Sequence, residues 1–300
     1  MMEPREALEL ARSLDAGGFE ELLRRAIAFL EGGGPAGGRA SRRGGLVAIE
    51  RFPGSIVVVG DLHGDAESLG QLLSGPAGRA IVEGGVVVFL GDYVDRGPAQ
   101  VEVLAAVLAL MMERPGSVVA LRGNHEPPPW LLPSPHDYPH SLASRFGQRG
   151  RELYDLSMEL FQRLPHAAFS GNGLFMVHGG PPSEPRRLAD LERPERADLE
   201  DLLWSDPSPI RGSAPSPRGA GHLYGPDVSS RFLSDNGLSM IVRSHEPCEG
   251  YRVDHGGRVV TVFSRRGPPY MNSRIGYFRA SASDPPGEPE RHAAVLRGPT

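Results

Sequence analysis

The chain has 300 residues, 39% of them hydrophobic, which is enough for one large α/β domain or two small ones around a substantial core. Its formal net charge of −5 is too small to indicate a general affinity for nucleic acid. The single cysteine, Cys248, excludes an internal disulfide, and no apolar run approaches the roughly 18–20 residues of a membrane span, so we expect a cytoplasmic protein without a membrane partner.

The first 45 residues predict a helical segment and a connector. Apolar residues recur at helical spacing from Glu3 to Glu31, with a break at Gly17-Gly18, which predicts two amphipathic helices. Residues 32–45 are rich in Gly and Arg, as is typical of a flexible connector. We interpret the helices as a brace packed on the main domain, with a lid or a partner-binding surface as the alternative.

Three short runs rich in β-branched residues each end in a polar motif. Runs of this kind, bounded by glycine, predict strands that are buried on both faces. The polar residues then lie just past the strand ends, where open α/β sheets place their ligand sites. The three segments are 56–65, 86–97 and 118–126, with the motifs Gly-Asp-Leu-His-Gly-Asp, Gly-Asp-Tyr-Val-Asp-Arg-Gly and Arg-Gly-Asn-His-Glu.

Helical patterns over 66–73 and 99–113 separate these strands, which indicates βαβ units. The pattern stops at Pro127, because the proline-rich run that follows suits neither a helix nor a central strand. We interpret 127–139 as an inserted loop beside the site and as a candidate for substrate selection. A surface excursion without functional consequence is the alternative.

The second half of the chain predicts further strands that deliver histidines. Residues 174–177 form an apolar run that ends at His178, and residues 240–244 lead in the same way to His245. The other predicted elements are strands over 46–49, 168–169 and 274–279, helices over 152–164 and 227–236, and a hairpin of 251–254 with 259–263. Residues 281–300 are polar and Pro-rich and predict a loose C-terminal tail.

Four residues in the first three motifs offer donor atoms for metal ions. Asp61, His63, Asp92 and Asn124 carry the oxygen and nitrogen atoms that suit divalent Mn, Fe or Zn. Asp61 and His63 are two apart in an extended segment, so both side chains can point the same way. A carboxylate such as Asp92 can bridge two ions, and ions paired about 3.5–4 Å apart recur in phosphoester hydrolysis. The motifs therefore predict a metal centre.

Together the three motifs resemble those of the phosphoprotein phosphatase family of serine/threonine phosphatases, within the calcineurin-like metallophosphoesterases. The resemblance extends to His178-Gly-Gly, Trp204-Ser-Asp-Pro and Arg243-Ser-His245, and it covers roughly 46–279. It implies an α/β fold in which two mixed β-sheets form a sandwich flanked by helices. It also implies a metallophosphoesterase catalytic domain over 46–280, preceded by the helical segment and connector of 1–45 and followed by the polar tail of 281–300.

The resemblance further implies two divalent metal ions, with Mn expected and Fe or Zn as alternatives. One ion is assigned to Asp61, His63 and Asp92, and the other to Asp92, Asn124, His178 and His245. The implied reaction is the hydrolysis of phosphoserine or phosphothreonine in a protein or peptide. A water activated by the two metals attacks phosphorus directly, without a covalent phosphoenzyme.

More roles follow from the same resemblance. His125 is the candidate general acid, oriented by Asp95 through its other ring nitrogen. Three arginines are candidate phosphate clamps because a guanidinium matches two phosphate oxygens, and Tyr270 is a candidate donor to a phosphate oxygen. The arginines are Arg96, Arg122 and Arg218, for each of which a plain surface arginine is the alternative. The loop of 264–270 departs from the family pattern through extra arginines, which leaves the peptide preference open.

Two other functions compete with this one. A dinucleoside polyphosphate hydrolase shares the first three motifs, whereas residues 204–207 and Arg218-Gly219 favour the protein phosphatase. A catalytically silent binding module on the same scaffold would have lost metal ligands, yet every expected ligand position and His125 are filled. We therefore expect a phosphatase whose partner is a phosphorylated protein or peptide.

Overall fold

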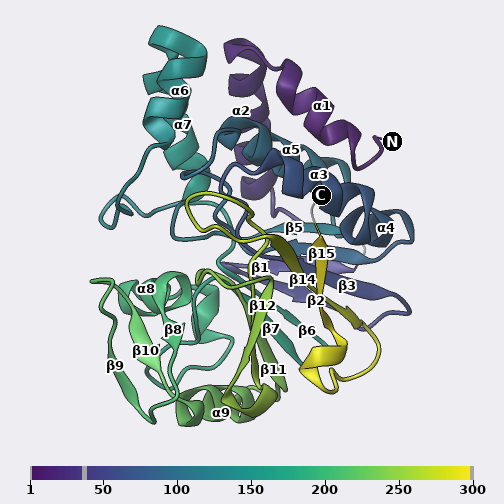
Figure 1. The fold of residues 1–300 in the computed structure, drawn as a ribbon, viewed down its shortest axis with the longest axis vertical. Coiled ribbons are helices and arrows are strands. Elements are labelled where there is room, and N and C mark those ends of the chain that lie inside the picture. Colours follow the sequence, from purple (N-terminus) through teal and green to yellow (C-terminus); the bar gives the residue numbers. More distant parts are fainter. Residues whose placement is uncertain (1, 36–38, 298–300) are drawn as a thin grey trace.

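A computed structural model describes residues 2–35 and 39–297. These residues form a sandwich of two mixed β-sheets, one of seven strands and one of five, with a separate sheet of three short strands. Helices cover both outer faces of the sandwich (Figure 1). This architecture confirms the expected α/β fold, and the three-stranded sheet is an addition that the sequence did not predict. None of the described helices is long and apolar enough to cross a membrane.

The five-stranded sheet carries the first three motifs. Three neighbouring strands of this sheet are parallel: β3 (Ser55–Val59), β4 (Val86–Phe89) and, at the edge, β5 (Val118–Ala120). Their side chains alternate between two cores: Ile56 and Val58 face the other sheet, whereas Val57 and Val59 face helices. Burial on both faces explains why the sequence of each strand is a continuous apolar run.

The C-terminal segment completes this sheet, so the expected loose tail over 281–300 is wrong for residue 281 and for residues 293–297. Strand β14 (Arg274–Ser281) pairs antiparallel with β3, and β15 (Ala293–Arg297) pairs antiparallel with β14. Ala293 is 7% exposed and lies opposite Phe278. The surrounding sequence is polar and does not predict a strand. Strand β15 forms because pairing with β14 buries its residues and satisfies its backbone hydrogen bonds. Residues 298–300 lie outside the described part of the chain.

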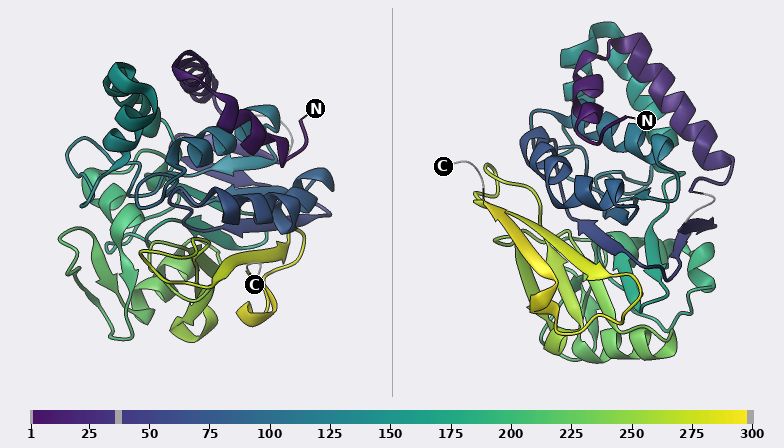
Figure 2. Two further views of the ribbon diagram at one scale, coloured as in Figure 1. Left: turned by 45° about the horizontal axis from the view of Figure 1, so that its top comes forward. Right: turned by 90° about the vertical axis from the view of Figure 1, so that its right-hand side faces the viewer.

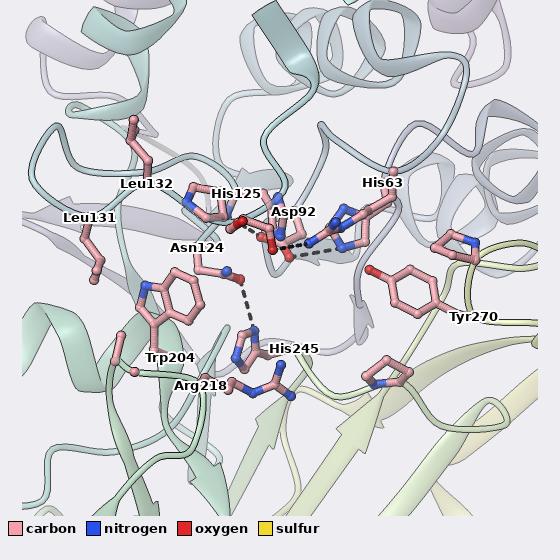
Figure 3. Close-up of a pocket in the computed structure, with 17 residues that line it drawn as sticks. His63, Asp92, Asn124, His125, Leu131, Leu132, Trp204, Arg218, His245 and Tyr270 are labelled. Carbon is pink, nitrogen blue, oxygen red and sulfur yellow. Dashed lines mark hydrogen bonds and ion pairs between the residues drawn. The ribbon is translucent and has the colours of Figure 1, made fainter.

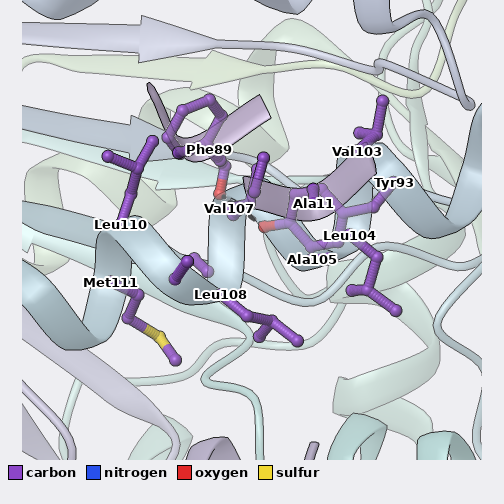
Figure 4. Close-up of a cluster of buried hydrophobic side chains, with 14 of the residues drawn as sticks. Ala11, Phe89, Tyr93, Val103, Leu104, Ala105, Val107, Leu108, Leu110 and Met111 are labelled. Carbon is purple, nitrogen blue, oxygen red and sulfur yellow. Dashed lines mark hydrogen bonds between the residues drawn. The ribbon is translucent and has the colours of Figure 1, made fainter. Parts of the chain in front are cut away.

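Helices cover the outer face of the five-stranded sheet (Figure 2). They include the predicted crossover helices α3 (Ala66–Ser74) and α5 (Gln100–Glu113), together with α4 (Pro76–Val82), which was not predicted. Most of α5 is buried, and its apolar residues form the centre of the cluster in Figure 4. The apolar contacts between these helices and the sheet hold in place the strands whose ends carry the motifs.

Two N-terminal helices, α1 (Glu6–Ser13) and α2 (Ala16–Glu31), rest on this layer as predicted. The break between them falls before Gly17-Gly18, because Asp15 caps α2: its carboxylate accepts a hydrogen bond from the Gly18 amide at 2.8 Å. The predicted break at the two glycines is therefore wrong by one turn. The apolar faces of both helices are buried in the same cluster as α5.

The seven-stranded sheet delivers the later motif histidines. Strand β7 (Leu174–Val177) leads into His178, and β11 (Met240–Arg243) leads into His245, both as predicted. The remaining strands are β1 (Ala40–Arg43), β2 (Leu46–Ile49), β6 (Ala167–Ser170), β12 (Tyr251–Asp254) and β13 (Val259–Val262). The expected flexible connector over 32–45 is wrong for residues 40–43, because these residues pair antiparallel with β2 as strand β1. Residues 36–38 of the expected connector lie outside the described part of the chain.

The outer face of this sheet packs against α9 (Pro226–Asp235), and smaller elements surround the strand ends. The expected loop over 127–139 is confirmed up to Asp137, after which a helix begins despite Pro139, because proline is tolerated in a first turn. The helices are α6 (Tyr138–Phe146), α7 (Gly150–Phe161) and α8 (Arg196–Trp204), with 3₁₀ turns over Gly147–Arg149, Asp190–Glu192, His255–Gly257 and Pro289–Arg291. The three-stranded sheet consists of β8 (Asp206–Pro207), β9 (Ser213–Pro215) and β10 (His222–Tyr224).

The place of β15 in the sheet can be tested by Ala293→Asp. This substitution puts a carboxylate against Phe278 and should lower the free energy of unfolding by about 1–3 kcal/mol, because a buried polar group without a partner loses its hydration. Urea denaturation measures the change. Arg291→Asp, at an exposed side chain, is the control and should have little effect. Equal effects of the two variants would contradict the pairing of β15.

Candidate active site

The candidate site lies where the ends of the two sheets meet. A parallel bridge between Asp61 and Phe263 joins them. The loops after β4 and β5 approach so closely at Gly91 and Gly123 that side chains would not fit: a Cβ on Gly91 would lie 2.1 Å from the Gly123 nitrogen, and one on Gly123 would lie 2.2 Å from Asp92 Oδ1. Glycine at both positions therefore allows the second and third motifs to touch.

The six predicted metal ligands come together in one buried cluster. Each residue is at most 7% exposed, and they are Asp61, His63, Asp92, Asn124, His178 and His245. On one side of the cluster, His63 Nε2 lies 3.3 Å from Asp92 Oδ2 and 3.7 Å from Asp61 Oδ2. Figure 3 shows Asp92 between His63 and Asn124. One carboxylate thus lies within reach of both halves of the cluster.

The other half of the cluster is equally close. His178 Nε2 lies 3.5 Å from Asp92 Oδ1 and 2.8 Å from Asn124 Oδ1, and His245 Nδ1 lies 3.0 Å from the same amide oxygen. These atoms come from both sheets, because His178 and His245 follow strands of the seven-stranded sheet. The cluster therefore exists only when the sandwich is assembled.

Backbone carbonyls orient two of the imidazoles. His63 Nδ1 lies 2.8 Å from the Val94 carbonyl oxygen, and His178 Nδ1 lies 3.2 Å from that of Leu90. When each Nδ1 donates to its carbonyl, the lone pair of each Nε2 faces Asp92. A fixed tautomer of this kind is what prepares a histidine to bind a metal ion. His245 Nε2 is buried and has no hydrogen-bond partner within residues 2–35 and 39–297.

Burial sets the electrostatics of the cluster. It raises the pKa of Asp61 to about 6, although a hydrogen bond from Ser244 opposes the shift. Burial and then the charge of Asp61 raise the pKa of Asp92 well above its usual value. The pKa values of the three ligand histidines are likewise lowered well below normal by burial. Desolvated carboxylates that face neutral imidazoles form a donor set that fits divalent cations.

Two supporting residues were not predicted as site residues. The buried Glu126 carboxylate accepts hydrogen bonds from the backbone amides of Asp92 at 2.7 Å, Tyr93 at 2.8 Å and Gly123 at 3.0 Å, and so ties the second motif to the third. Ser244 Oγ lies 2.5 Å from Asp61 Oδ1 and accepts from the Asp61 amide at 2.9 Å. Both residues lie inside the sequence motifs, and this position was the only indication in the sequence that they belong to the site.

The predicted acid and its partner form a pair beside the cluster. His125 Nδ1 lies 2.5 Å from Asp95 Oδ2, and His125 lines the pocket. Burial lowers the pKa of His125, although the hydrogen bond to Asp95 opposes the shift. Asp95 itself is fully buried. The geometry leaves His125 Nε2 as the ring nitrogen that can exchange a proton in the pocket.

The predicted phosphate-binding residues divide into two groups. Arg96, Arg218 and Tyr270 line the pocket, and Figure 3 labels the last two. Arg218 Nε donates to Asp206 at 2.7 Å, which orients this guanidinium. Arg122 is buried and donates to the Glu126 carbonyl at 2.8 Å and to Gln162 at 3.0 Å. The structure therefore places Arg122 behind the third motif and not among the described residues that line the pocket.

The pocket is larger than a phosphate group requires, at about 530 Å³. Part of its wall is apolar and consists of Leu131, Leu132 and Trp204. The first two belong to the 127–137 loop, so the proline-rich insertion does border the site. A substrate can extend from the buried cluster along this wall.

The fit of the cluster to divalent cations can be tested by its stability. Mn²⁺ at 100 times its Kd should raise the free energy of unfolding by about 2.7 kcal/mol for one site, because it binds the folded chain alone. Asp92→Asn should lose most of this increase, since the shared carboxylate is gone. Urea denaturation with and without Mn²⁺ measures both. Asp155→Asn, on the surface of α7, is the control, and an equal response from the two variants would contradict the assignment.

Comparison with known proteins agrees with this geometry. Residues 54–249 match the family described as calcineurin-like phosphoesterase. The chain is 35% identical over 229 residues to a probable serine/threonine-protein phosphatase of Encephalitozoon cuniculi, covering 74% of this chain and 48% of the relative. It is 36% identical over 244 residues to human serine/threonine-protein phosphatase 5, covering 76% and 46%. The chain thus spans about half the length of these relatives.

A solved structure extends the comparison. It is a protein serine/threonine phosphatase from Saccharomyces cerevisiae, described as similar to human phosphatase PP5. The match has a TM-score of 0.75 at 25% identity and covers 94% of this chain and 89% of that one. Motifs, fold and relatives agree, and the chain belongs to the calcineurin-like phosphoesterase family, within its phosphoprotein phosphatase branch.

Proposed function

We propose that the chain hydrolyses phosphoserine and phosphothreonine in proteins or peptides, with two divalent cations as cofactors. The observation that carries this proposal is the convergence of five further donor residues around Asp92, with the His125–Asp95 pair beside them. The relatives named as serine/threonine-protein phosphatases support the choice of substrate class. Mn is the cation that we expect, with Fe or Zn as alternatives.

Each cation has its own set of ligands in this proposal. Asp61, His63 and Asp92 would hold one, while Asp92, Asn124, His178 and His245 would hold the other. When bound, the two cations supply an activated water and offset the charge of the phosphate. The residues of the chain then keep the donors desolvated and oriented, through Val94, Leu90 and Ser244.

In this proposal, other residues of the pocket bind the phosphate and protonate the leaving group. The guanidinium groups of Arg96 and Arg218 bind phosphate oxygens, and Asp206 holds Arg218 in place by a hydrogen bond. Tyr270 lines the same pocket and stacks on His63 with ring centroids 5.7 Å apart, and its hydroxyl would donate to one of these oxygens. His125 donates a proton to the serine or threonine oxygen, because an alkoxide is a poor leaving group. Asp95 keeps His125 in the orientation that this requires.

A dinucleoside polyphosphate hydrolase is the second candidate. The first three motifs suit it equally, since they hold cations and not the rest of the substrate. The environment of Arg218 favours the protein phosphatase: Asp206, from the Trp-Ser-Asp-Pro segment, aims Arg218 into the pocket that Trp204 borders. These residues belong to the part of the resemblance that is particular to the protein phosphatases.

A direct assay separates the two candidates. With Mn²⁺ present, turnover should be fastest with a phosphoserine or phosphothreonine peptide, slower with a phosphotyrosine peptide and slower still with a dinucleoside tetraphosphate. Chelation of the cations should abolish activity towards all of them. Release of inorganic phosphate and chromatography of the nucleotide products provide the measurements. A tenfold or greater preference for the dinucleotide would overturn the proposed substrate class.

The role of His125 is tested by His125→Gln. This variant should retain its bound Mn²⁺ but lose about 10²–10⁴-fold in kcat on the phosphoserine peptide, the usual contribution of general acid catalysis. Steady-state kinetics and elemental analysis of the dialysed protein measure the two quantities. His140→Gln, at an exposed histidine of α6, is the matched control and should behave as wild type. Loss of metal from His125→Gln would assign His125 to the metal centre instead.

A further inference from the structure

We propose that His136, in the proline-rich loop of 127–137, is a positioning residue that holds Asp95 and thereby fixes His125 as the proton donor. The inference rests on the proposed function, because it assigns a residue to the protonation of the leaving group. His136 belongs to no motif: the sequence predicts a loop beside the site over 127–139 but does not single out this histidine.

The contact geometry singles out His136. Its Nδ1 lies 2.8 Å from Asp95 Oδ2, the same oxygen that His125 Nδ1 approaches to 2.5 Å. Its Nε2 lies 3.0 Å from the hydroxyl of Tyr154 on α7. The side chain is 9% exposed. A histidine whose two ring nitrogens are both engaged, one of them by the partner of the candidate acid, is not a chance surface residue.

The end of the same loop and the first residue of α6 bind the other oxygen of Asp95. The backbone amides of Asp137 and Tyr138 each donate to Asp95 Oδ1 at 2.7 Å. The carboxylate is therefore bound by two imidazole nitrogens at one oxygen and by two amides at the other. Burial opposes its ionisation, yet the hydrogen bonds from His125 and His136 outweigh burial and hold the pKa of Asp95 well below its usual range. Asp95 stays charged and cannot rotate.

The backbone at Asp95 needs this support. Asp95 has φ 64 and Arg96 has φ 72, in the left-handed region that residues other than glycine rarely adopt. The loop also binds Arg96: the Asp137 carboxylate accepts from its amide at 3.1 Å, and the Ser134 carbonyl accepts from its guanidinium at 3.3 Å. The loop therefore holds the strained turn that carries Asp95, the partner of His125, and Arg96, a proposed phosphate-binding residue.

His136 acts on the reaction through Asp95 and does not touch the substrate. Neither residue is among the described residues that line the pocket, whereas His125 is. When Tyr154 donates to Nε2, the neutral imidazole of His136 donates from Nδ1 to Asp95 without adding a charge. In the reaction, the water oxygen bonds to phosphorus as the bond from phosphorus to the serine oxygen breaks, and the Nε2 proton of His125 passes to that oxygen. The products are inorganic phosphate and the serine hydroxyl.

This role predicts an effect that depends on the leaving group. Proton donation matters for serine and for phenol, whose pKa of about 10 makes its anion a poor leaving group. It matters little for p-nitrophenol, a stronger acid. His136→Phe keeps the ring but removes the donor, whereas His136→Asn retains one N–H near the position of Nδ1. His140→Phe is the matched control at an exposed histidine.

The experiment compares kcat and KM of these variants, loaded with Mn²⁺, on a phosphoserine peptide, phenyl phosphate and p-nitrophenyl phosphate. His136→Phe should lose about 10–100-fold in kcat on the first two, the same order as the loss when a residue that orients a metal-binding side chain is removed, with KM nearly unchanged. It should lose less than about 3-fold on p-nitrophenyl phosphate, and His136→Asn should recover most of the loss. Mn²⁺ content should match that of His140→Phe, and the melting temperature should fall by no more than a few degrees, because Asp95 and the Tyr154 hydroxyl each lose one hydrogen-bond partner.

Two outcomes would overturn the role of His136: an equal loss on phenyl and p-nitrophenyl phosphate, or a His136→Asn variant as impaired as His136→Phe. The proposed function fails separately. If wild type cleaves phenyl phosphate but not the phosphoserine or phosphothreonine peptide, the substrate class is wrong. The ratio of the two aryl phosphates still decides the role of His136 in that case.

Discussion

The constraint on which the rest of the site depends is the desolvation of Asp92 between two imidazoles. Its two oxygens lie within 3.5 Å of His63 Nε2 and His178 Nε2, in a cluster from which water is largely excluded. A carboxylate in that position is unfavourable without positive charge, so the arrangement suits cations and little else. Glu126, which holds the Asp92 backbone from behind, and the carbonyls of Val94 and Leu90 all serve to maintain it.

The residues around Asp92 come from both sheets of the sandwich, so the geometry of the site depends on how the two sheets pack. Asp61 and Asp92 follow parallel strands of the five-stranded sheet, while His178 and His245 follow strands of the other sheet. Apolar residues from both sheets form the core between them, so the relative position of the two sheets fixes the distances in the site. Occupancy of the centre by metal ions and the packing of the two sheets are therefore thermodynamically linked.

The sequence predicts the parts of this structure that local patterns determine. Because β3, β4 and β5 are buried on both faces, their sequences are apolar runs rich in β-branched residues, and the donor residues follow shortly after the strand ends. Features set by distant contacts were missed or misplaced. Strand β15 lies in a polar segment and exists through its pairing with β14. Arg122 stands in a motif, yet its guanidinium turns to Glu126 and Gln162. His136 reaches Asp95 only because the loop folds back over the second motif.

The loop of 127–137 reaches the second motif without regular secondary structure, and its composition explains how. Proline residues already restrict the backbone of the unfolded chain, so ordering this segment forfeits less conformational entropy than ordering an ordinary loop of equal length. Contacts to Asp95 and Arg96 can therefore persist although no helix or sheet holds the loop over these residues. Substitution of its prolines by glycine would loosen the second motif from a distance, even where no contact to the pocket is lost.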